Sequence, residues 1–147
     1  MREPQQGCEL LIDECLPEKS YSLFNEIKHF TVKHSLWEGK SNGNLLNSCD
    51  KNKIRFILTC DKKMLRQQIE NIRNYNVSII IFMTKGNGTK MLEPLAINFV
   101  KHYESFKNKL EKGKIFLLYD KDIINVSEPE FDHAKRLSYI PIQIFKF

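Results

Sequence analysis

Arginine is scarce in this sequence, and several familiar functional motifs are missing from it. The five arginines are Arg2, Arg55, Arg66, Arg73 and Arg136. Because bidentate recognition of phosphates and guanines usually draws on arginine, this scarcity disfavours sequence-specific DNA binding. Neither G-x-x-x-x-G-K-[ST] nor G-x-G-x-x-G occurs, so the sequence carries no P-loop and no dinucleotide-binding fingerprint. No apolar run approaches the roughly 20 residues that cross a bilayer, and we expect no contact with membranes.

Paired cysteine motifs are also absent. The four cysteines are Cys8, Cys15, Cys49 and Cys60, and no two of them form C-x-x-C. The chain opens on a polar segment with no apolar signal sequence. We therefore expect reduced thiols in an intracellular protein, nuclear or cytoplasmic. Cys60 precedes a predicted helix whose field could lower the pKa of its thiol, but its apolar neighbours favour a buried structural cysteine.

The chain has enough apolar material for one core and a modest basic excess. Its 147 residues predict a single α/β domain over residues 1–147, and 41% of them are hydrophobic. Lysine and arginine number 23 against 18 acidic residues, a net charge of +5. This balance permits nucleic acid as a partner without requiring it. The Gly-, Ser- and Asn-rich stretch near residues 38–52 predicts an exposed flexible loop.

Apolar runs predict the strands of a sheet. The runs are 9–12, 54–60, 77–83 and 114–119, and a terminal strand is predicted over 139–145. The run at 77–83 is rich in β-branched residues, as in a central strand covered on both faces. Pro141 places the terminal strand at an edge.

Helical periodicity lies between these runs. Leu23, Ile27 and Phe30 predict an amphipathic helix from about residue 20 to 32, and apolar residues recur every three or four positions from 92 to 110. A third helix follows Asp61, a favoured N-cap residue. Alternation of strands and helices predicts a three-layer Rossmann-like or flavodoxin-like sandwich, with a mainly parallel sheet of four to five strands.

Acidic residues follow three of the predicted strands. Asp13 and Glu14 follow the first, Asp61 the second, and Asp120 with Asp122 the one at 114–119. Ligands of parallel α/β sheets bind beyond the carboxyl ends of the strands, where converging carboxylates can hold Mg²⁺. This placement is similar to that of PIN-like nucleases. The resemblance implies a Mg²⁺-dependent nuclease or phosphatase with Asp13, Asp61, Asp120 and Asp122 as candidate metal ligands, the first three also being catalytic candidates.

Other interpretations of these residues remain open. Asp61 can serve as a helix cap, Asp13 and Glu14 can begin a solvated turn, and Asp120 with Asp122 can be ordinary surface residues. A separate candidate for anion binding is the turn that precedes the long helix, where two glycines and two lysines meet a helix N-terminus. Its residues are Lys85, Gly86, Gly88 and Lys90.

Two classes of function follow from the sequence. The favoured one is a non-catalytic protein-interaction or scaffold domain, including a degenerate enzyme fold, within a larger intracellular assembly. It is favoured because no nucleophile, base and orienting group form a recognisable set. It needs no cofactor, and its partner is a protein. The alternative is the Mg²⁺-dependent nuclease or phosphatase.

Overall fold

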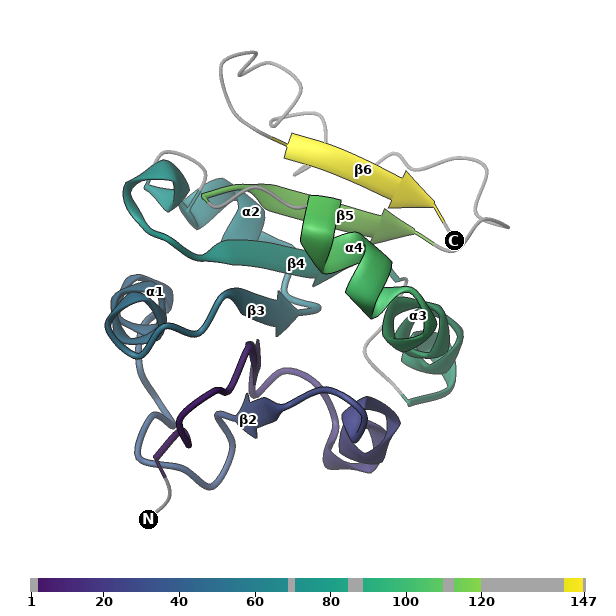
Figure 1. Ribbon diagram of the computed structural model, residues 1–147, viewed down its shortest axis with the longest axis horizontal. Helices are drawn as coiled ribbons and strands as arrows, with labels where there is room; N and C mark the ends of the chain where they lie inside the picture. The colour runs from purple at the N-terminus through teal and green to yellow at the C-terminus, as the bar shows by residue number, and fades with distance from the viewer. Residues whose placement is uncertain (1–2, 69–70, 85–88, 110–112, 120–141, 147) are drawn as a thin grey trace.

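The fold is built around a parallel β-sheet. The computed structural model describes residues 3–68, 71–84, 89–109, 113–119 and 142–146, and every structural statement below concerns these residues. Six parallel strands pair in the order β2-β1-β3-β4-β5-β6 (Figure 1). The strands are β1 (Leu10–Ile12), β2 (His29–Thr31), β3 (Phe56–Thr59), β4 (Ser78–Phe82), β5 (Ile115–Tyr119) and β6 (Ile142–Lys146).

This sheet confirms the predicted parallel α/β fold and adds one strand to the expected number. The order of the first five strands is that of flavodoxin-like sheets. The run at 77–83 forms β4, which lies between β3 and β5 and is buried along its whole length. The terminal strand lies at the edge, as predicted, although residues 139–141 of its expected range are outside the described residues.

Both faces of the sheet are covered by apolar side chains. Leu11, Ile57 and Ile79 contribute to the hydrophobic cluster on one face, whereas Leu10 and Phe56 contribute to the cluster on the other. This division follows from the alternation of side chains along a strand. The first face packs against α1 (Asn42–Lys51), α2 (Lys63–Gln68) and the 3₁₀ turn η2 (Ile72–Asn74), and the second against the 3₁₀ helix η1 (Glu18–Phe24), α3 (Thr89–Lys101) and α4 (Tyr103–Lys109).

The helix predicted from about residue 20 to 32 is wrong in its second half. The segment begins with the 3₁₀ helix η1, which ends at Phe24, and then forms the edge strand β2. Phe30 and Thr31 suit a pleated strand, and backbone pairing with β1 outweighs the helical spacing of the apolar residues. Trp37, which follows β2, is buried and packs edge to face on Phe30 with ring centroids 5.4 Å apart.

The flexible loop predicted near residues 38–52 is also wrong. Most of this stretch forms α1, which begins after Ser41 and ends at Lys51. The Ser41 hydroxyl accepts a hydrogen bond from the backbone N–H of Asn44 and so caps the helix. Tertiary burial outweighs the polar composition, because one face of the helix packs on the sheet. That face carries Leu45, Leu46 and Cys49.

The helical pattern predicted from 92 to 110 is confirmed over the described residues, which reach Lys109 here, but it divides into two helices. Helix α3 ends at Lys101, and α4 starts at Tyr103 and ends at Lys109. Pro94 lies inside α3, in its second turn, where it cannot donate the backbone hydrogen bond of a regular helix. In the described part of the chain, no helix has both the length and the apolar character that a membrane crossing requires.

The aromatic cluster beneath α3 predicts where the fold is most sensitive to truncation. Phe82 of β4 is fully buried, with ring centroids 5.8 Å from Phe99 and 6.4 Å from Phe24. Phe82→Ala should lower the free energy of unfolding by about 3–5 kcal/mol, since it leaves a cavity between sheet and helix. Urea denaturation followed by circular dichroism measures this.

Ile97→Ala is the matched control. Ile97 lies on α3 with half of its surface exposed, and its truncation should change the free energy of unfolding by less than about 1 kcal/mol. Equal losses in the two variants would contradict the packing described for α3.

Candidate functional site

At the carboxyl ends of the neighbouring strands β1, β3 and β4, the chain continues toward opposite faces of the sheet. After β1 and β4 the chain continues into η1 and α3, which pack on one face. After β3 it continues into α2, which packs on the opposite face. Ligand sites in this class of fold usually lie at such a divergence, beyond the carboxyl ends of the strands. The end of β3 is therefore the central position of the site.

Asp13 lies at this edge, directly after β1, and its side chain is held in place by three contacts. It is only 6% exposed. Its Oδ1 accepts the backbone N–H of Glu14 at 2.9 Å, and its Oδ2 accepts the Thr59 hydroxyl at 2.8 Å and the Cys15 thiol at 3.3 Å. The predicted solvated turn is therefore wrong for Asp13, whereas Glu14 is exposed. Burial of an acid needs such compensation by hydrogen bonds.

Thr59 connects Asp13 to the second predicted acid. Its fully buried hydroxyl donates to Asp13 and accepts the backbone N–H of Asp61 at 3.0 Å. Asp61 in turn accepts the backbone N–H of Lys63 through Oδ1 at 3.0 Å. Asp61 is thus the predicted cap at the start of α2. The structure places Asp13 and Asp61 at the ends of adjacent strands, joined by a single hydroxyl group.

Two thiols complete this cluster. The sulfur atoms of Cys15 and Cys60 lie 3.3 Å apart, and the Cys15 sulfur also accepts the backbone N–H of Cys60 at 3.3 Å. The hydrogen bond between the sulfurs raises the pKa of Cys15 and lowers that of Cys60, while burial and the neighbouring Asp13 add to the rise for Cys15. Cys60 is half-buried and packs against the apolar cluster that contains Phe56, so it is less buried than the sequence suggests.

The structure does not test every predicted site residue. Asp120 and Asp122 lie outside the described residues, as do Lys85, Gly86 and Gly88 of the predicted anion-binding turn. Lys90 is described and is exposed at the start of α3.

Thr59 and Cys15 contribute to the site although the sequence did not single them out. Both follow from position in the chain. Thr59 is the last residue of β3, and Cys15 comes two residues after Asp13, so both fall at the carboxyl edge once β1 and β3 pair in parallel. The signal that could have identified Thr59 is a polar residue at the end of an apolar strand.

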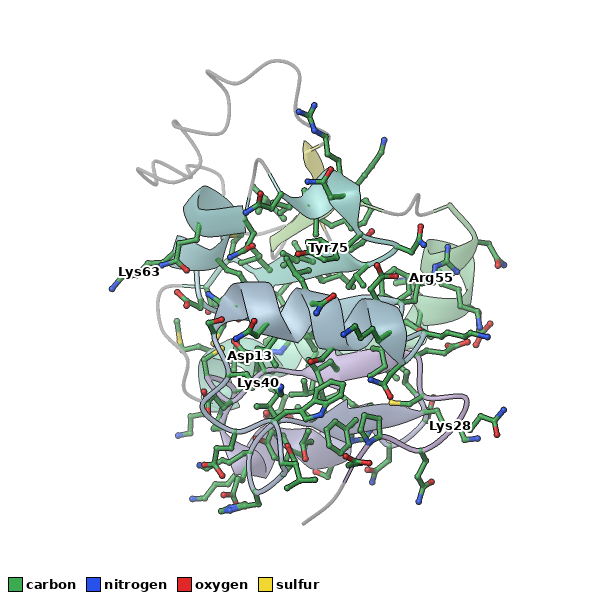
Figure 2. The ribbon with its side chains drawn as sticks, turned by 90° about the vertical axis from the view of Figure 1, so that its left-hand side faces the viewer. Asp13, Lys28, Lys40, Arg55, Lys63 and Tyr75 are labelled. Carbon is green, nitrogen blue, oxygen red and sulfur yellow. The ribbon has the colours of Figure 1, made fainter. Side chains whose placement is uncertain are left out.

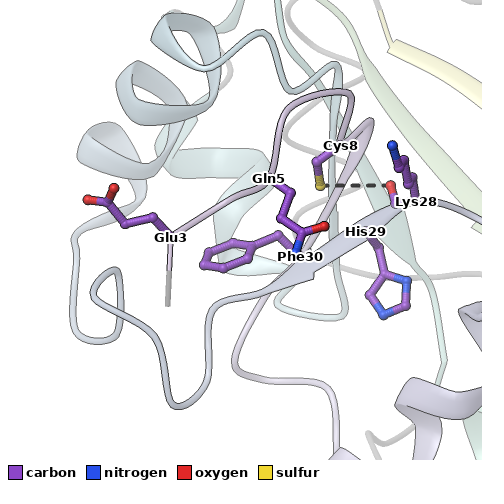
Figure 3. A pocket seen from close by; sticks show the side chains of 6 residues that line it. All are labelled: Glu3, Gln5, Cys8, Lys28, His29 and Phe30. Atoms are coloured by element: carbon purple, nitrogen blue, oxygen red, sulfur yellow. Dashed lines mark hydrogen bonds between the residues drawn. The ribbon is translucent and has the colours of Figure 1, made fainter. Parts of the chain in front are cut away.

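The opposite edge of the sheet carries two hollows that have different chemistry. One, of about 320 Å³, is lined by residues that precede or begin β1 and β2, including Cys8, Lys28 and His29 (Figure 3). The other, of about 420 Å³, is lined by Asp50, Lys53, Arg55 and Asn76. Figure 2 shows Asp13 and Lys63 at one end of the molecule and Lys28 and Arg55 at the other. These hollows are therefore separate from the Asp13 cluster.

Neither metal geometry nor similarity to known proteins decides the chemistry. Among the described residues, no group of three or more His, Cys, Asp or Glu side chains is arranged to hold a metal ion. Comparison of the chain with protein-family models, curated proteins and solved structures finds no match. The side chains at the carboxyl edge are therefore the features that bear on function.

The bridging hydroxyl of Thr59 gives a test of this geometry. Thr59→Val preserves the shape of the side chain but removes the donor to Asp13 and the acceptor for the Asp61 N–H. We expect a loss of about 2–3 kcal/mol in the free energy of unfolding, because a buried carboxyl group loses a hydrogen-bond partner. Thermal and urea denaturation measure it.

Thr59→Ser is the matched comparison. It retains the hydroxyl and removes one buried methyl group, and it should cost only about 1 kcal/mol. A Val variant at least as stable as the Ser variant would show that the hydroxyl does not hold the Asp13 cluster together.

Proposed function

We propose that this chain is a Mg²⁺-dependent phosphodiester hydrolase, with Asp13 and Asp61 as the residues that bind the ion. The observation that carries the proposal is the buried carboxyl group of Asp13 at the carboxyl edge of the sheet. The Thr59 hydroxyl donates to this carboxyl group and accepts the backbone N–H of Asp61. Burial of a carboxylate costs free energy, and hydrogen bonds to neutral donors offset only part of this cost. A buried acid at this position is therefore a candidate for a function beyond stability. Its position agrees with the ligand sites of parallel α/β sheets.

The free coordination capacity of the two acids fits Mg²⁺. The three contacts to Asp13 leave one of the roughly four lone-pair positions of a carboxylate. Asp61 is half-buried, and among the described residues only its Oδ1 accepts a hydrogen bond. Mg²⁺ is usually held by one or two carboxylates, with water and substrate phosphate completing the shell, so a third protein ligand is not required. The ion would polarise the phosphodiester and favour hydroxide formation from water.

The strand order favours this pair over the other predicted acids. Strands β1 and β3 are neighbours, so their carboxyl ends lie about 5 Å apart. The end of β5, which precedes Asp120, is separated from β3 by β4, a distance of about 10 Å. Asp13 and Asp61 are thus the acids best placed to share an ion.

The charge of the chain suits a polyanionic substrate. The excess of five positive charges is carried mostly by lysine, which binds phosphate without reading bases. We therefore propose single-stranded nucleic acid, cleaved with little sequence preference, as the substrate to test first.

Cleavage of labelled single-stranded RNA and DNA oligonucleotides in Mg²⁺ or Mn²⁺ tests this function. We expect Asp13→Asn and Asp61→Asn to lower the rate at least about 100-fold, since each removes a negatively charged ligand of the ion. Chelation by EDTA should abolish cleavage, and added Mg²⁺ should restore it. The far-ultraviolet circular dichroism spectrum of each variant verifies that it is folded.

Asp50→Asn is the control variant. Asp50 lines the hollow at the opposite edge, so this substitution changes the net charge equally and should leave the rate within about twofold. Absence of metal-dependent cleavage of both oligonucleotides and of bis(p-nitrophenyl) phosphate by the folded chain would refute the proposed function.

A non-catalytic interaction domain is the second candidate, and the role of Asp61 as a helix cap favours it. The contact of its Oδ1 with Lys63 gives this acid a structural purpose that needs no metal. We expect an interaction domain to capture the same protein from cell extract before and after nuclease treatment. Capture should also survive Asp13→Asn, and loss of capture in that variant would count against this candidate.

A further inference from the structure

The Cys15 and Cys60 thiols form a pair whose chemistry the proposed hydrolysis does not use. Cys15 belongs to the segment after β1 and Cys60 to the segment after β3, 45 positions later in the chain. Their sulfur atoms are 3.3 Å apart and both side chains are half-buried, whereas Cys8 and Cys49 are buried. The pair therefore combines proximity with access from solvent, and both favour reversible thiol oxidation.

We propose that Cys15 and Cys60 form a reversible disulfide by exchange with a small-molecule disulfide of the glutathione type. The site is a redox modification site at the carboxyl edge of the sheet, next to Asp13. Closing the bond requires the sulfur atoms to approach from 3.3 Å to about 2.05 Å, a movement of little more than 1 Å. The adjacent strands β1 and β3 already bring the two segments together.

The exchange proceeds in two balanced steps. One protein thiolate attacks a sulfur of the small disulfide, whose S–S bond breaks as the new bond to the protein forms, and one small thiol leaves. The second protein thiolate then attacks the protein sulfur of this mixed disulfide and releases the second small thiol. The protein loses two electrons and two protons, and the small-molecule disulfide gains them as two thiols.

Oxidation would change the surroundings of Asp13. In the reduced chain the Cys15 thiol donates to Asp13 Oδ2 and lies 3.1 Å from the Thr59 hydroxyl. A disulfide has no S–H donor, and the Cys15 sulfur must move toward Cys60. Asp13 therefore loses one of its three contacts on oxidation. Disulfide formation itself is independent of the proposed function, whereas its effect on cleavage rests on that function.

Peptide mapping under non-reducing conditions tests the disulfide in the intact 147-residue chain. The Cys8→Ala, Cys49→Ala double variant keeps only the proposed pair. After incubation with glutathione disulfide it should lose two hydrogens in mass and yield a single cross-linked peptide containing Cys15 and Cys60. Dithiothreitol should reverse the change. Cys15→Ser and Cys60→Ser should yield no intramolecular cross-link at the site, and at most a mixed disulfide with glutathione.

Thermal denaturation provides a second readout. Closing a loop of this length should raise the melting temperature of the oxidised double variant by about 10 °C, with no rise in either serine variant. A double variant that carries glutathione on one cysteine without closing the intramolecular bond would overturn the proposal. A cross-link in wild-type protein that joins Cys8 or Cys49 instead would overturn it as well.

The cleavage assay separates this inference from the proposed function. If oxidation changes the rate at least about fivefold in the double variant, and dithiothreitol reverses the change, the disulfide regulates the Asp13 site. If the cross-link forms while the reduced and oxidised chains both lack activity, the modification site stands and the hydrolase proposal fails. If the chain cleaves the oligonucleotides but the cross-link does not form, the hydrolase proposal stands and the proposed disulfide is refuted.

Discussion

Parallel pairing of β1 with β3 is the constraint on which the rest of the structure depends. The register aligns Ile12 with Leu58, and the ladder continues past β1 through the backbone N–H of Asp13, which donates to the carbonyl of Leu58 at 2.9 Å. Both strands therefore end at the same level, and the polar residues that follow them meet. With another register, Thr59 would not reach Asp13, since successive side chains of a strand point to opposite faces.

The two edges of the sheet use their acids in different ways. At the amino edge, Glu9 accepts a hydrogen bond from the Tyr103 hydroxyl at 2.9 Å and forms an ion pair with Lys107 at 3.2 Å. These two contacts connect α4 to the residue that precedes β1. Burial and the Glu9 contact raise the pKa of Tyr103, which stays protonated. Asp13, at the carboxyl edge, accepts hydrogen bonds from neutral donors and has no cation partner among the described residues. An acid balanced by neutral donors alone is better suited to receive a cation from solution.

Part of the candidate site was predictable from local sequence, and part was not. Asp13 and Asp61 could be placed at the carboxyl edge because each directly follows an apolar run, and parallel strands end at a common edge. The contact between Cys15 and Cys60 was not predictable, because their 45-position separation becomes a 3.3 Å distance only through the register of β1 and β3. Segment 38–52 was misjudged for a related reason. Its glycine, serine and asparagine content indicates a loop, and only burial of Leu45 and Leu46 against the sheet makes it a helix.

By itself the sequence determined the class of the fold and the edge where its acids gather. Long apolar runs enriched in β-branched residues, separated by helical periodicity, are compatible with few arrangements other than a parallel sheet between helices. Tertiary structure alone decided that residues 29–31 form an edge strand, that α1 covers one face, and that Asp13, Thr59, Cys15 and Cys60 share one hydrogen-bonded cluster. The physical reason is that strand pairing and burial act between segments far apart in the chain, whereas periodicity reports only on near neighbours.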